Sequence, residues 1–363
     1  MRSIKYLDNH DKYMSFALDL AKKGMGLVAP NPLVGCVIVK NGRVIGEGYH
    51  IGFGKDHAEV MALKNCTESP VGARLYVNLE PCSIFGKTHP CTKAIIENSI
   101  SEVYIGARDS NPKVDGEGVK ELEKAGIKVT QNILHDECLE INKSFFKWIV
   151  TRKPYVIAKV AQTKDGYMGY DRNSSIWITG KKTKEHTHTL RSMVDAIMIG
   201  RNTAQIDNPK LTVRKVLGEN PKRIVLDTNR KLPLTLNIFN DANADTLIMC
   251  SENRFENNKT SFCKFIGVKE KNGLLDPLDI LVKLGDEGIT SILIEGGTRV
   301  HNSFFKANLI DEIYLYTSSN KIEGASLKNP LLLDDKWITD DKIFLAEDVL
   351  TISKKKELCL QES

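Results

Sequence analysis

The sequence has no long apolar segment and no concentrated block of basic residues. No apolar run in its 363 residues approaches the roughly 18 residues needed to cross a membrane. The N-terminal segment lacks the apolar stretch of a secretory signal peptide. The formal net charge at pH 7 is only +5, and no long basic run indicates nucleic-acid binding. We therefore expect a cytoplasmic globular protein that binds neither a membrane nor nucleic acid.

Cysteine is present without being abundant, with eight residues in the chain. In the cytoplasm thiols stay reduced, so we expect no disulfides and cysteines that are available as metal ligands. The hydrophobic and charged contents, 41% and 27%, are typical of a globular protein. The length exceeds one domain of about 100 to 200 residues. We expect two domains, 1–150 and 151–363, because the polar, proline-bearing segment Thr151–Pro154 is a plausible junction.

Hydrophobic patterns predict alternating helices and strands in both halves, which indicates an α/β fold in each. In the first half, strands are predicted at 34–39, 74–79, 102–107 and 127–130, and helices at 9–23, from 57, from 91, from 117 and at 135–150. In the second half, strands are predicted at 155–162, 167–170, 196–200, 223–227, 246–250, 291–295 and 312–317, and helices at 183–193, 277–284 and 298–306. His186 and His188 are two residues apart on a predicted helix and do not converge, so we expect both to be solvated.

The residues that carry chemistry are His57-Ala58-Glu59, Pro81-Cys82 and Cys91. One histidine and two cysteines can hold Zn²⁺ and leave its fourth position open to a water, whose pKa the metal lowers towards neutrality. Glu59 is then the acid and base that moves protons, as in enzymes that hydrolyse an exocyclic amine. Residues two apart on a helix point roughly 200° away from each other. The metal must therefore meet His57 at a helix start, and Cys91 follows Pro90 at a second one.

The spacing of the two cysteines departs from the usual pattern of zinc deaminases, which has two residues between them. Here Ser83–Pro90 separates them and includes Gly86-Lys87-Thr88, which suits an anion such as phosphate. A nucleoside or nucleic-acid deaminase remains an alternative, although the latter should have a basic, aromatic-rich groove. A non-enzymatic protein with a structural zinc is another, and it would need a fourth ligand such as His50 or His89. The cysteines could also be buried inert thiols.

Three segments, Asn31–Val39, His57–Glu59 and Leu79–Cys91, resemble the deaminase half of the bifunctional riboflavin-biosynthesis deaminase/reductase family. The resemblance implies a cytidine-deaminase-like three-layer domain. It also implies a pocket for a phosphorylated ribosylaminopyrimidine, lined by Asn31, His50, Lys87, Asp109 and Asn111. The chain departs from the family at Ile84 and His89, where His and Pro are usual. Each pocket residue also has a plain structural reading, for example Lys87 as a solvated loop lysine and Asp109 as a turn residue.

The second half resembles the reductase of the same family in Lys159–Gly166, Ser175–Thr179, Arg191, Thr203–Arg214 and Ile294–Gly297. The resemblance implies a dihydrofolate-reductase-like fold, with substrate contacts from Ser175, Arg191, Leu211, Arg214 and Glu295. It further implies an NADPH site lined by Ala161, Trp177, Thr203, Asp207 and Gly297. Two arginines suit a phosphate because a guanidinium binds its oxygens in a bidentate way. Alternatively, the arginines form surface salt bridges and Trp177 belongs to the core.

Together these features predict two successive reactions on one substrate, 2,5-diamino-6-(5-phosphoribosylamino)pyrimidin-4-one. Zinc-dependent hydrolysis removes an amine as ammonia, and NADPH then reduces the ribosyl group to a ribityl chain. The preference for NADPH follows from the resemblance alone, because no residue pattern identifies a 2′-phosphate site. We also expect a homo-oligomer, whose size the sequence does not indicate.

Overall fold

The computed structural model describes residues 10–84, 89–111, 116–170, 177–256, 263–340 and 342–356. The chain divides into two compact units, Met1–Arg152 and Lys153–Ser363, so the change of unit falls within Thr151–Pro154. Each unit has its own sheet and its own hydrophobic core. Within the described residues, no helix is both long and apolar enough to span a membrane.

The first unit contains a five-stranded sheet in the order β2-β1-β3-β4-β5. Its strands are β1 (Gly35–Lys40), β2 (Arg43–Tyr49), β3 (Arg74–Leu79), β4 (Glu102–Ala107) and β5 (Lys128–Thr130). β1 pairs antiparallel with β2 and β3, whereas β3, β4 and β5 are parallel. The hairpin between β1 and β2 turns at Asn41 and Gly42, whose φ angles of 50° and 75° are those that Asn-Gly readily adopts.

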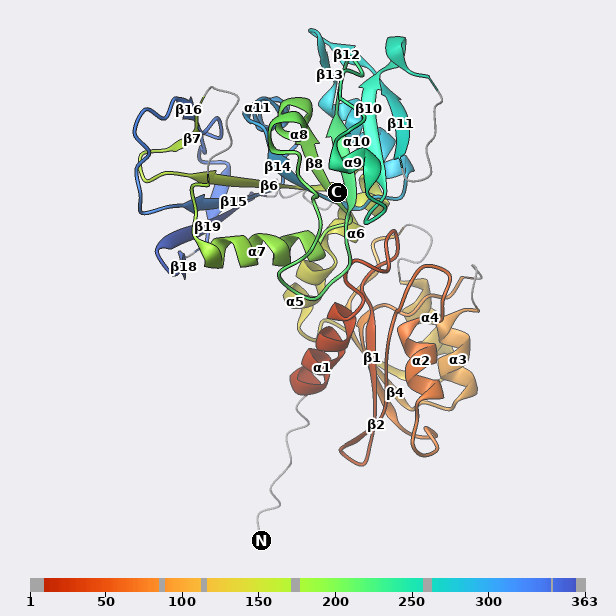
Figure 1. Ribbon diagram of the computed structural model, residues 1–363. Helices are drawn as coiled ribbons and strands as arrows, with labels where there is room; N and C mark the ends of the chain where they lie inside the picture. Colours follow the sequence, from red (N-terminus) through yellow and green to blue (C-terminus); the bar gives the residue numbers. More distant parts are fainter. Residues whose placement is uncertain are drawn as a thin grey trace. The chain divides into compact units, whose positions relative to one another are not determined.

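Helices cover both faces of this sheet and complete three layers. They are α1 (His10–Lys22), α2 (Ala58–Lys64), α3 (Cys91–Glu97), α4 (Glu117–Lys124), α5 (His135–Ile141) and α6 (Lys143–Thr151). α1 and α5 contribute to the core on one face, and α2, α3 and α4 to the core on the other (Figure 1). Gly35 lets α1 approach β1, because a Cβ there would lie 2.0 Å from the Ala17 carbonyl oxygen.

The prediction of one helix over 135–150 was wrong, because the chain forms α5 and α6 with a break at Asn142. The Asn142 side chain is buried and bonds to the backbone of Leu33. Its Oδ1 accepts from the Leu33 N–H at 2.8 Å, and its Nδ2 donates to the Leu33 carbonyl at 2.9 Å. Two long-range hydrogen bonds therefore fix the point at which the helix changes direction.

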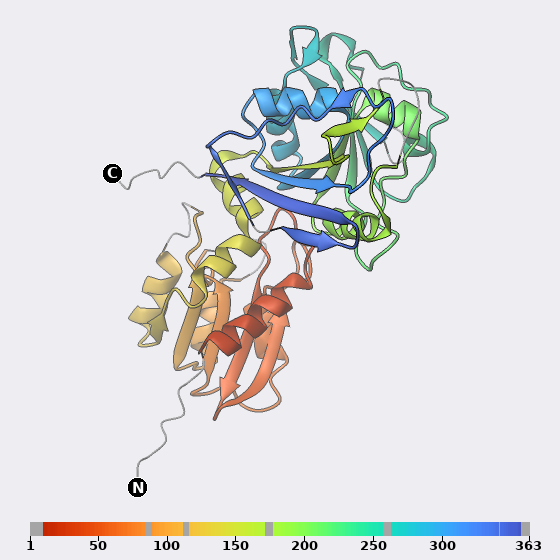
Figure 2. The same cartoon turned by 90° about the vertical axis from the view of Figure 1, so that its left-hand side faces the viewer.

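The second unit contains a ten-stranded sheet in the order β11-β10-β9-β8-β14-β6-β15-β19-β17, with β18 also paired to β19. Its strands are β6 (Tyr155–Gln162), β8 (Ala196–Gly200), β9 (Lys222–Leu226), β10 (Thr246–Ser251), β11 (Cys263–Val268), β14 (Ser291–Gly296), β15 (Glu312–Thr317), β17 (Trp337–Thr339), β18 (Ile343–Leu345) and β19 (Asp348–Lys355). The strands from β11 to β15 are parallel, and β17, β18 and β19, at the blue end of the chain in Figure 2, pair antiparallel.

Short elements outside this sheet are the strands β7 (Tyr167–Gly169), β12 (Glu270–Lys271), β13 (Leu274–Leu275) and β16 (Leu327–Lys328) and the 3₁₀ helix Glu252–Arg254. The helices are α7 (Lys181–Ser192), α8 (Arg201–Asp207), α9 (Asn237–Asn240), α10 (Pro277–Asp286) and α11 (Thr298–Lys306). Buried side chains of α7, α8 and α9 join the core on one face, and those of α10 and α11 join the core on the other. The unit is therefore a doubly covered α/β sheet.

Candidate active sites

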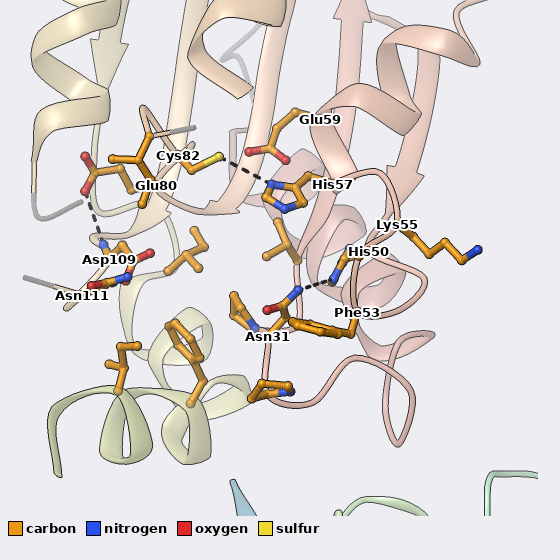
Figure 3. A pocket seen from close by; sticks show the side chains of 18 of the residues that line it. Asn31, His50, Phe53, Lys55, His57, Glu59, Glu80, Cys82, Asp109 and Asn111 are labelled. Carbon is orange, nitrogen blue, oxygen red and sulfur yellow. Dashed lines mark hydrogen bonds between the residues drawn. The ribbon is translucent and has the colours of Figure 1, made fainter. Parts of the chain in front are cut away.

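His57, Cys82 and Cys91 bring three potential metal ligands together in the first unit. His57 is the N-cap of α2, with its carbonyl accepting the first helical hydrogen bond from Met61, and Cys91 is the first residue of α3. Cys82 follows β3 after Pro81, and its carbonyl accepts from the Thr92 N–H at 3.2 Å, which holds it beside α3. The ligand atoms all lie within 4.8 Å of one another. The His57 Nδ1 is 3.2 Å from Cys91 Sγ. It is 3.5 Å from Cys82 Sγ, the contact drawn in Figure 3.

Contacts among these three groups shift their pKa values, and only the shift of Cys82 favours the form that binds a metal. A hydrogen bond from Cys91, together with one from His57, lowers the pKa of Cys82 to about 4. The hydrogen bond with Cys82 raises the pKa of His57 to about 9, and burial adds to the effect of Cys82 in raising that of Cys91. One thiolate is therefore stable before a metal binds, whereas zinc must displace a proton from His57 and from Cys91. An imidazole with two thiolates is a donor set that zinc prefers.

The described residues offer three ligands to this site and no fourth. The groups that could hold a metal are His57, Cys82 and Cys91 alone among those residues. His50 uses both ring nitrogens elsewhere, because Nε2 lies 2.9 Å from Asn31 Nδ2 and Nδ1 lies 3.1 Å from the Asp56 carbonyl. A zinc ion held here would keep one position open, which is the arrangement of a catalytic rather than a structural site.

Glu59 lies in the first turn of α2 beside the ligand cluster and is 3% exposed. Its Oε2 has no hydrogen-bond partner among the described residues. Burial raises the pKa of its carboxyl, with the nearby His57 acting in the opposite direction. A buried oxygen without a partner is costly unless a ligand or water meets it. Glu59 is thus placed to exchange a proton with a molecule bound in the adjoining cavity (Figure 3).

A cavity of about 400 Å³ opens beside this cluster and is lined by residues of the first unit alone. Of the residues predicted to bind the substrate, Asn31, His50, Asp109 and Asn111 line this cavity, and Lys87 lies outside the described residues. Of the two departures from the family pattern, Ile84 also lines the cavity. The sequence did not point to the aromatic wall, which is formed by Phe53, Phe145 and Trp148. An aromatic wall suits the flat face of a heterocyclic ring.

Glu80 was also missed and connects the metal-binding segment to the pocket loop. It is buried, and its Oε2 accepts from the backbone N–H of Asp109 at 3.3 Å and of Gly116 at 3.1 Å, while Oε1 accepts from Val119 at 3.2 Å. Asp109 Oδ1 in turn accepts from the Asn111 N–H at 2.8 Å. The Glu80 carboxylate therefore holds the loop that carries Asp109 and Asn111 (Figure 3). Glu80 itself lies two residues before Cys82 in the chain.

The second unit contains a buried ion pair between Arg191 of α7 and Glu295 of β14. The Arg191 Nε and Nη2 donate to the two Glu295 oxygens at 2.6 and 2.8 Å, and Nη1 donates to the Thr212 carbonyl at 3.1 Å. The attraction of Arg191 outweighs the effect of burial and lowers the pKa of Glu295. Arg191 was predicted to contact a substrate phosphate. The structure pairs most of its guanidinium with Glu295 and the backbone, leaving only its remaining N–H groups for such a contact.

His188 joins this cluster, and the prediction that it is solvated was wrong. It is 4% exposed, and its Nδ1 accepts from the Arg214 backbone N–H at 3.1 Å. Burial and the nearby Arg191 lower its pKa to about 4, so the ring is neutral and can accept that bond. His186 is half-buried rather than solvated, with Nδ1 2.7 Å from the Tyr316 hydroxyl. Spacing along one helix could not reveal these partners on other segments.

A cavity of about 570 Å³ lies beside Glu295 at the carboxyl edge of the second sheet. Thr203, Asp207 and Gly297 of the predicted cofactor set line it. Ala161 and Trp177 of the same set do not line it. Ala161 packs against the core. Trp177 is 74% exposed, and the Lys184 Nζ lies 3.7 Å from the centre of its ring. In the predicted substrate set, Leu211 is buried in the core, Arg214 Nη1 donates to Thr212 Oγ1 at 2.8 Å, and Ser175 lies outside the described residues.

Three glycines line this cavity, and at two of them a side chain would be crowded. A Cβ on Gly297 would lie 3.0 Å from Thr203 Oγ1, and one on Gly200 would lie 2.9 Å from the Val300 side chain. Gly296 ends β14 and also lines the cavity, and a Cβ there would make only an ordinary contact with Thr203 Oγ1 at 3.4 Å. Bare backbone at the starts of helices that follow parallel strands is where a nucleotide diphosphate can approach closely. The residues present therefore fit a dinucleotide cofactor.

Comparison with known proteins gives two matching families. Residues 7–107 match the cytidine and deoxycytidylate deaminase zinc-binding region, and residues 154–335 match the RibD C-terminal domain. The chain is 41% identical to the riboflavin biosynthesis protein RibD of Aquifex aeolicus (strain VF5) over 348 residues, which are 95% of this chain and 94% of that protein. It is 35% identical to the Escherichia coli (strain K12) protein of the same name, over 84% of this chain and 86% of that one.

Solved structures of the same kind of protein resemble this chain over nearly its whole length. A diaminohydroxyphosphoribosylaminopyrimidine deaminase/5-amino-6-(5-phosphoribosylamino)uracil reductase from Thermotoga maritima superposes with a TM-score of 0.86 at 34% identity, covering 96% of this chain and 99% of that one. RibD of Acinetobacter baumannii superposes with a TM-score of 0.83 at 31% identity and the same coverage. Both likenesses extend over the two units rather than one of them.

Proposed function

Because the chain belongs to the RibD family of bifunctional riboflavin-biosynthesis deaminase/reductases, we propose that its two sites share the family's reactions in the following way. The protein is a zinc-dependent deaminase and an NADPH-dependent reductase. Its substrate is a phosphoribosylaminopyrimidine, 2,5-diamino-6-(5-phosphoribosylamino)pyrimidin-4-one. The observation that carries the assignment of the first reaction is the convergence of His57, Cys82 and Cys91 beside the unpartnered carboxyl of Glu59.

His57 Nδ1 and the sulfurs of Cys82 and Cys91 would hold the zinc. When bound, zinc supplies Lewis-acid activation of a water at neutral pH. Glu59 would take up a proton from the attacking water through its unpartnered Oε2 and deliver it to the exocyclic nitrogen. The carbon–nitrogen bond breaks, a carbon–oxygen bond takes its place, and ammonia leaves. The raised pKa of Glu59 suits a group that must both take up and release a proton.

Asn31, His50, Asp109 and Asn111 orient the pyrimidine and its sugar in the cavity beside the zinc. The hydrogen bond from Asn31 to His50 fixes both side chains, so little ordering is left for the substrate to bring about. Lys87 is proposed from the family likeness to contact the substrate's phosphate. The reductase unit disfavours a nucleoside or nucleic-acid deaminase, and the two engaged nitrogens of His50 disfavour a structural zinc.

In the second unit, Glu295 and the remaining N–H groups of Arg191 face the substrate, and Arg214 is proposed to contact its phosphate. NADPH supplies the hydride. Thr203, Asp207 and Gly297 line the cofactor cavity next to Glu295, so the cofactor and the substrate can meet there. Ser175, Leu211, Ala161 and Trp177 are proposed from the family likeness alone.

We also place the enzyme in the cytoplasm as a homo-oligomer. The seven cysteines of the described residues form no disulfide, which suits a reducing compartment. Ile338, Ile343 and Phe344 on β17 and β18 expose apolar surface that a second copy would cover. Light scattering measures the mass in solution, and a monomer at all concentrations would contradict the oligomer.

The experiment that tests the function supplies purified protein with the diaminopyrimidine substrate and measures ammonia release and NADPH consumption. Ammonia should appear without NADPH, and NADPH should be consumed only after deamination or with the deaminated substrate. NADPH consumption that is independent of any pyrimidine, or no ammonia from zinc-loaded protein, would refute the assignment.

A further inference from the structure

Two buried side-chain amides from distant segments hold the backbone of Leu33 in the first unit. Asn78 of β3 is 0% exposed, and Asn142, between α5 and α6, is 2% exposed. The Nδ2 groups of both asparagines donate to the Leu33 carbonyl at 2.9 Å. The Asn142 Oδ1 accepts from the Leu33 N–H, and the Asn78 Oδ1 accepts from the Gly35 N–H, each at 2.8 Å. A primary amide offers both a donor and an acceptor, as a peptide group does. We call Asn78 and Asn142 the amide clamp, because together they take the place of a neighbouring strand.

The amide clamp lies where β1 and β3 stop pairing. Cys36 is the first residue of β1 that pairs with β3. One further step of the antiparallel ladder would bring Gly35 opposite Asn78, but the Gly35 N–H bonds to the Asn78 side chain instead. Beyond this point Val34 and Leu79 both line the cavity of about 400 Å³. The clamp therefore holds the chain at the point where the two strands give way to the cavity.

The amide clamp joins two parts of the cavity wall that are far apart in the sequence. Leu33 follows two residues after Asn31, which lines the cavity and whose Nδ2 lies 2.9 Å from His50 Nε2 (Figure 3). Asn142 is the N-cap of α6. Three apolar side chains of α6 also line the cavity: Phe145, Trp148 and Ile149. A shift at Leu33 would therefore move the Asn31 segment relative to the α6 wall.

The side chain of Asn142 serves this long-range contact rather than its own helix. Asparagine at an N-cap usually bonds through its side chain to a backbone N–H in the first turn of the helix. The Asn142 side chain makes no such bond. Both of its polar atoms bond to Leu33, 109 residues earlier in the chain. A residue that only stabilised α6 would make the local bond, so the observed geometry indicates a role in placing α6 against the Asn31 segment.

We propose that the amide clamp positions Asn31 and the α6 wall to bind the substrate of the deaminase. Neither Asn78 nor Asn142 lines the cavity, so both are positioning residues that do not touch the substrate. Glu59 and Cys91 belong to α2 and α3, which the four hydrogen bonds of the clamp do not reach. The clamp therefore acts on substrate binding more than on the chemical step. This inference rests on the proposed deaminase function and adds the residues that hold its pocket in shape.

The test compares Asn78→Leu, Asn142→Leu and the double variant with the unchanged protein. Ammonia release from the diaminopyrimidine substrate gives kcat and KM, and zinc content, the thermal midpoint and reduction of the deaminated substrate are measured alongside. Each single variant should raise the KM of deamination roughly tenfold, with full zinc content and unchanged reduction. Because both amides share the Leu33 carbonyl, the double variant should raise KM by less than the product of the two single effects. A loss of stability alone would lower the folded fraction, and with it the apparent kcat, while KM stayed the same.

A control variant and a measurement without substrate accompany these kinetics. Asn98→Leu is the matched control, because the Asn98 Nδ2 donates to the Ala94 carbonyl at 2.9 Å within α3 and the residue does not line the cavity. Its KM should equal that of the unchanged protein. Amide hydrogen exchange reports on the clamp directly. The Leu33 N–H should exchange roughly tenfold faster or more in Asn142→Leu, and the Gly35 N–H in Asn78→Leu, while β4 stays protected in both.

Three results would overturn the proposal, and each has a different meaning. A lower thermal midpoint with an unchanged KM would make the amide clamp a purely structural feature. Loss of zinc from the variants would show that the clamp supports the metal site rather than the pocket wall. Faster exchange at Leu33 and Gly35 with an unchanged KM would show that the clamp holds the segment without shaping the pocket. If the unchanged protein itself released no ammonia, the deaminase function would fail and this proposal with it, whereas a raised KM found only in the clamp variants supports both.

Discussion

The surroundings of Glu59 are sufficient to assign this residue a role in proton transfer. Its carboxyl is buried, one oxygen has no partner among the described residues, and the metal-ligand cluster lies beside it. A group with only a structural role would have its hydrogen bonds satisfied within the protein. The unsatisfied oxygen is therefore better explained by a bound water or substrate than by packing.

Replacing Glu59 by Gln should stop ammonia release while leaving the zinc in place. The amide has nearly the same shape but cannot take up a proton, and positioned acid–base catalysis contributes about 10²–10⁴-fold. Ammonia release should fall by at least that range, zinc measured by atomic absorption should stay at the content of the unchanged protein, and NADPH should still reduce the deaminated substrate. Retained deamination would remove Glu59 from the mechanism, and lost zinc would make it a structural support of the site.

His188 should make the stability of the second unit sensitive to mild acid. Its pKa of about 4 in the folded protein lies below the ordinary value of 6.5, so the folded state binds the proton more weakly than the unfolded state. Its stabilising effect is complete above pH 6.5 and is lost as the pH falls through 6.5 towards 4. The thermal midpoint of the unchanged protein should therefore fall more steeply over that interval than that of His188→Gln, whose amide oxygen can still accept from Arg214.

Other buried histidines, His301 among them, also have a lowered pKa, so only the difference between the two proteins reports on His188. Calorimetric scans at several pH values measure it. Parallel curves for the two proteins would show that His188 does not change its protonation on unfolding.

At the scale of elements, the Glu80 carboxylate links the end of β3 to the start of α4. It accepts three backbone hydrogen bonds, from Asp109, Gly116 and Val119, and so satisfies N–H groups at the start of the helix as well as one in the pocket loop. Loop and helix start are thereby fixed against the segment that carries Cys82.

Glu80→Gln should loosen this loop and weaken substrate binding more than it weakens zinc binding. The amide NH₂ would face a backbone donor, leaving at least one buried N–H unsatisfied, which costs about 1–3 kcal/mol. We expect the KM of deamination to rise roughly tenfold, with a smaller change in kcat, full zinc content and unchanged reduction.

Glu117→Gln is the matched control, because this exposed glutamate lies in the first turn of the same helix. Steady-state kinetics and chemical unfolding are measured for both variants. A loss of stability with an unchanged KM would make Glu80 a purely structural residue.

The sequence was sufficient for the elements whose pattern is local. The helix starts at His57 and Cys91, the buried parallel strands and the Asn41-Gly42 turn each depend on residues close together in the chain. The break between α5 and α6 depends instead on Asn142 meeting Leu33, 109 residues away. The antiparallel strands β17, β18 and β19 were missed because β17 and β18 are three residues long and mostly exposed, and the buried positions of β19 do not keep an alternation of two.

The residues of the candidate sites also fall into two groups, those that the sequence predicts and those that it does not. The sequence predicts four residues of the first site, because few functions require those residue types at that spacing: His57, Glu59, Cys82 and Cys91. The sequence does not predict the partners of Glu80, His188 and Arg191, because each partner lies on a distant segment that only the folded sheet brings close to the residue. Arg191 is the clearest case: its type suggested a phosphate ligand, but Glu295, 104 residues later, takes up most of its guanidinium.

At the scale of the whole molecule, each reaction has all of its described residues within one compact unit. The two cavities have separate linings, and each unit packs its own cores. A change that disables one reaction by altering its own site should therefore leave the other reaction measurable in the same chain, which provides an internal control for every variant.

Arg191→Ala should abolish reduction and leave deamination intact. It removes the group that faces the substrate and leaves the Glu295 carboxylate, which is 9% exposed, without its counter-charge. Breaking a buried pair in this way costs about 3–5 kcal/mol, so the second unit should also unfold at a lower temperature. The double variant Arg191→Met/Glu295→Gln removes both charges and should recover much of that stability without recovering reduction. Ammonia release, NADPH consumption and calorimetry on the three proteins separate the two causes. Reduction restored in the double variant would show that the pair serves only to stabilise the unit, and an equal loss of both activities in Arg191→Ala would contradict the independence of the two sites.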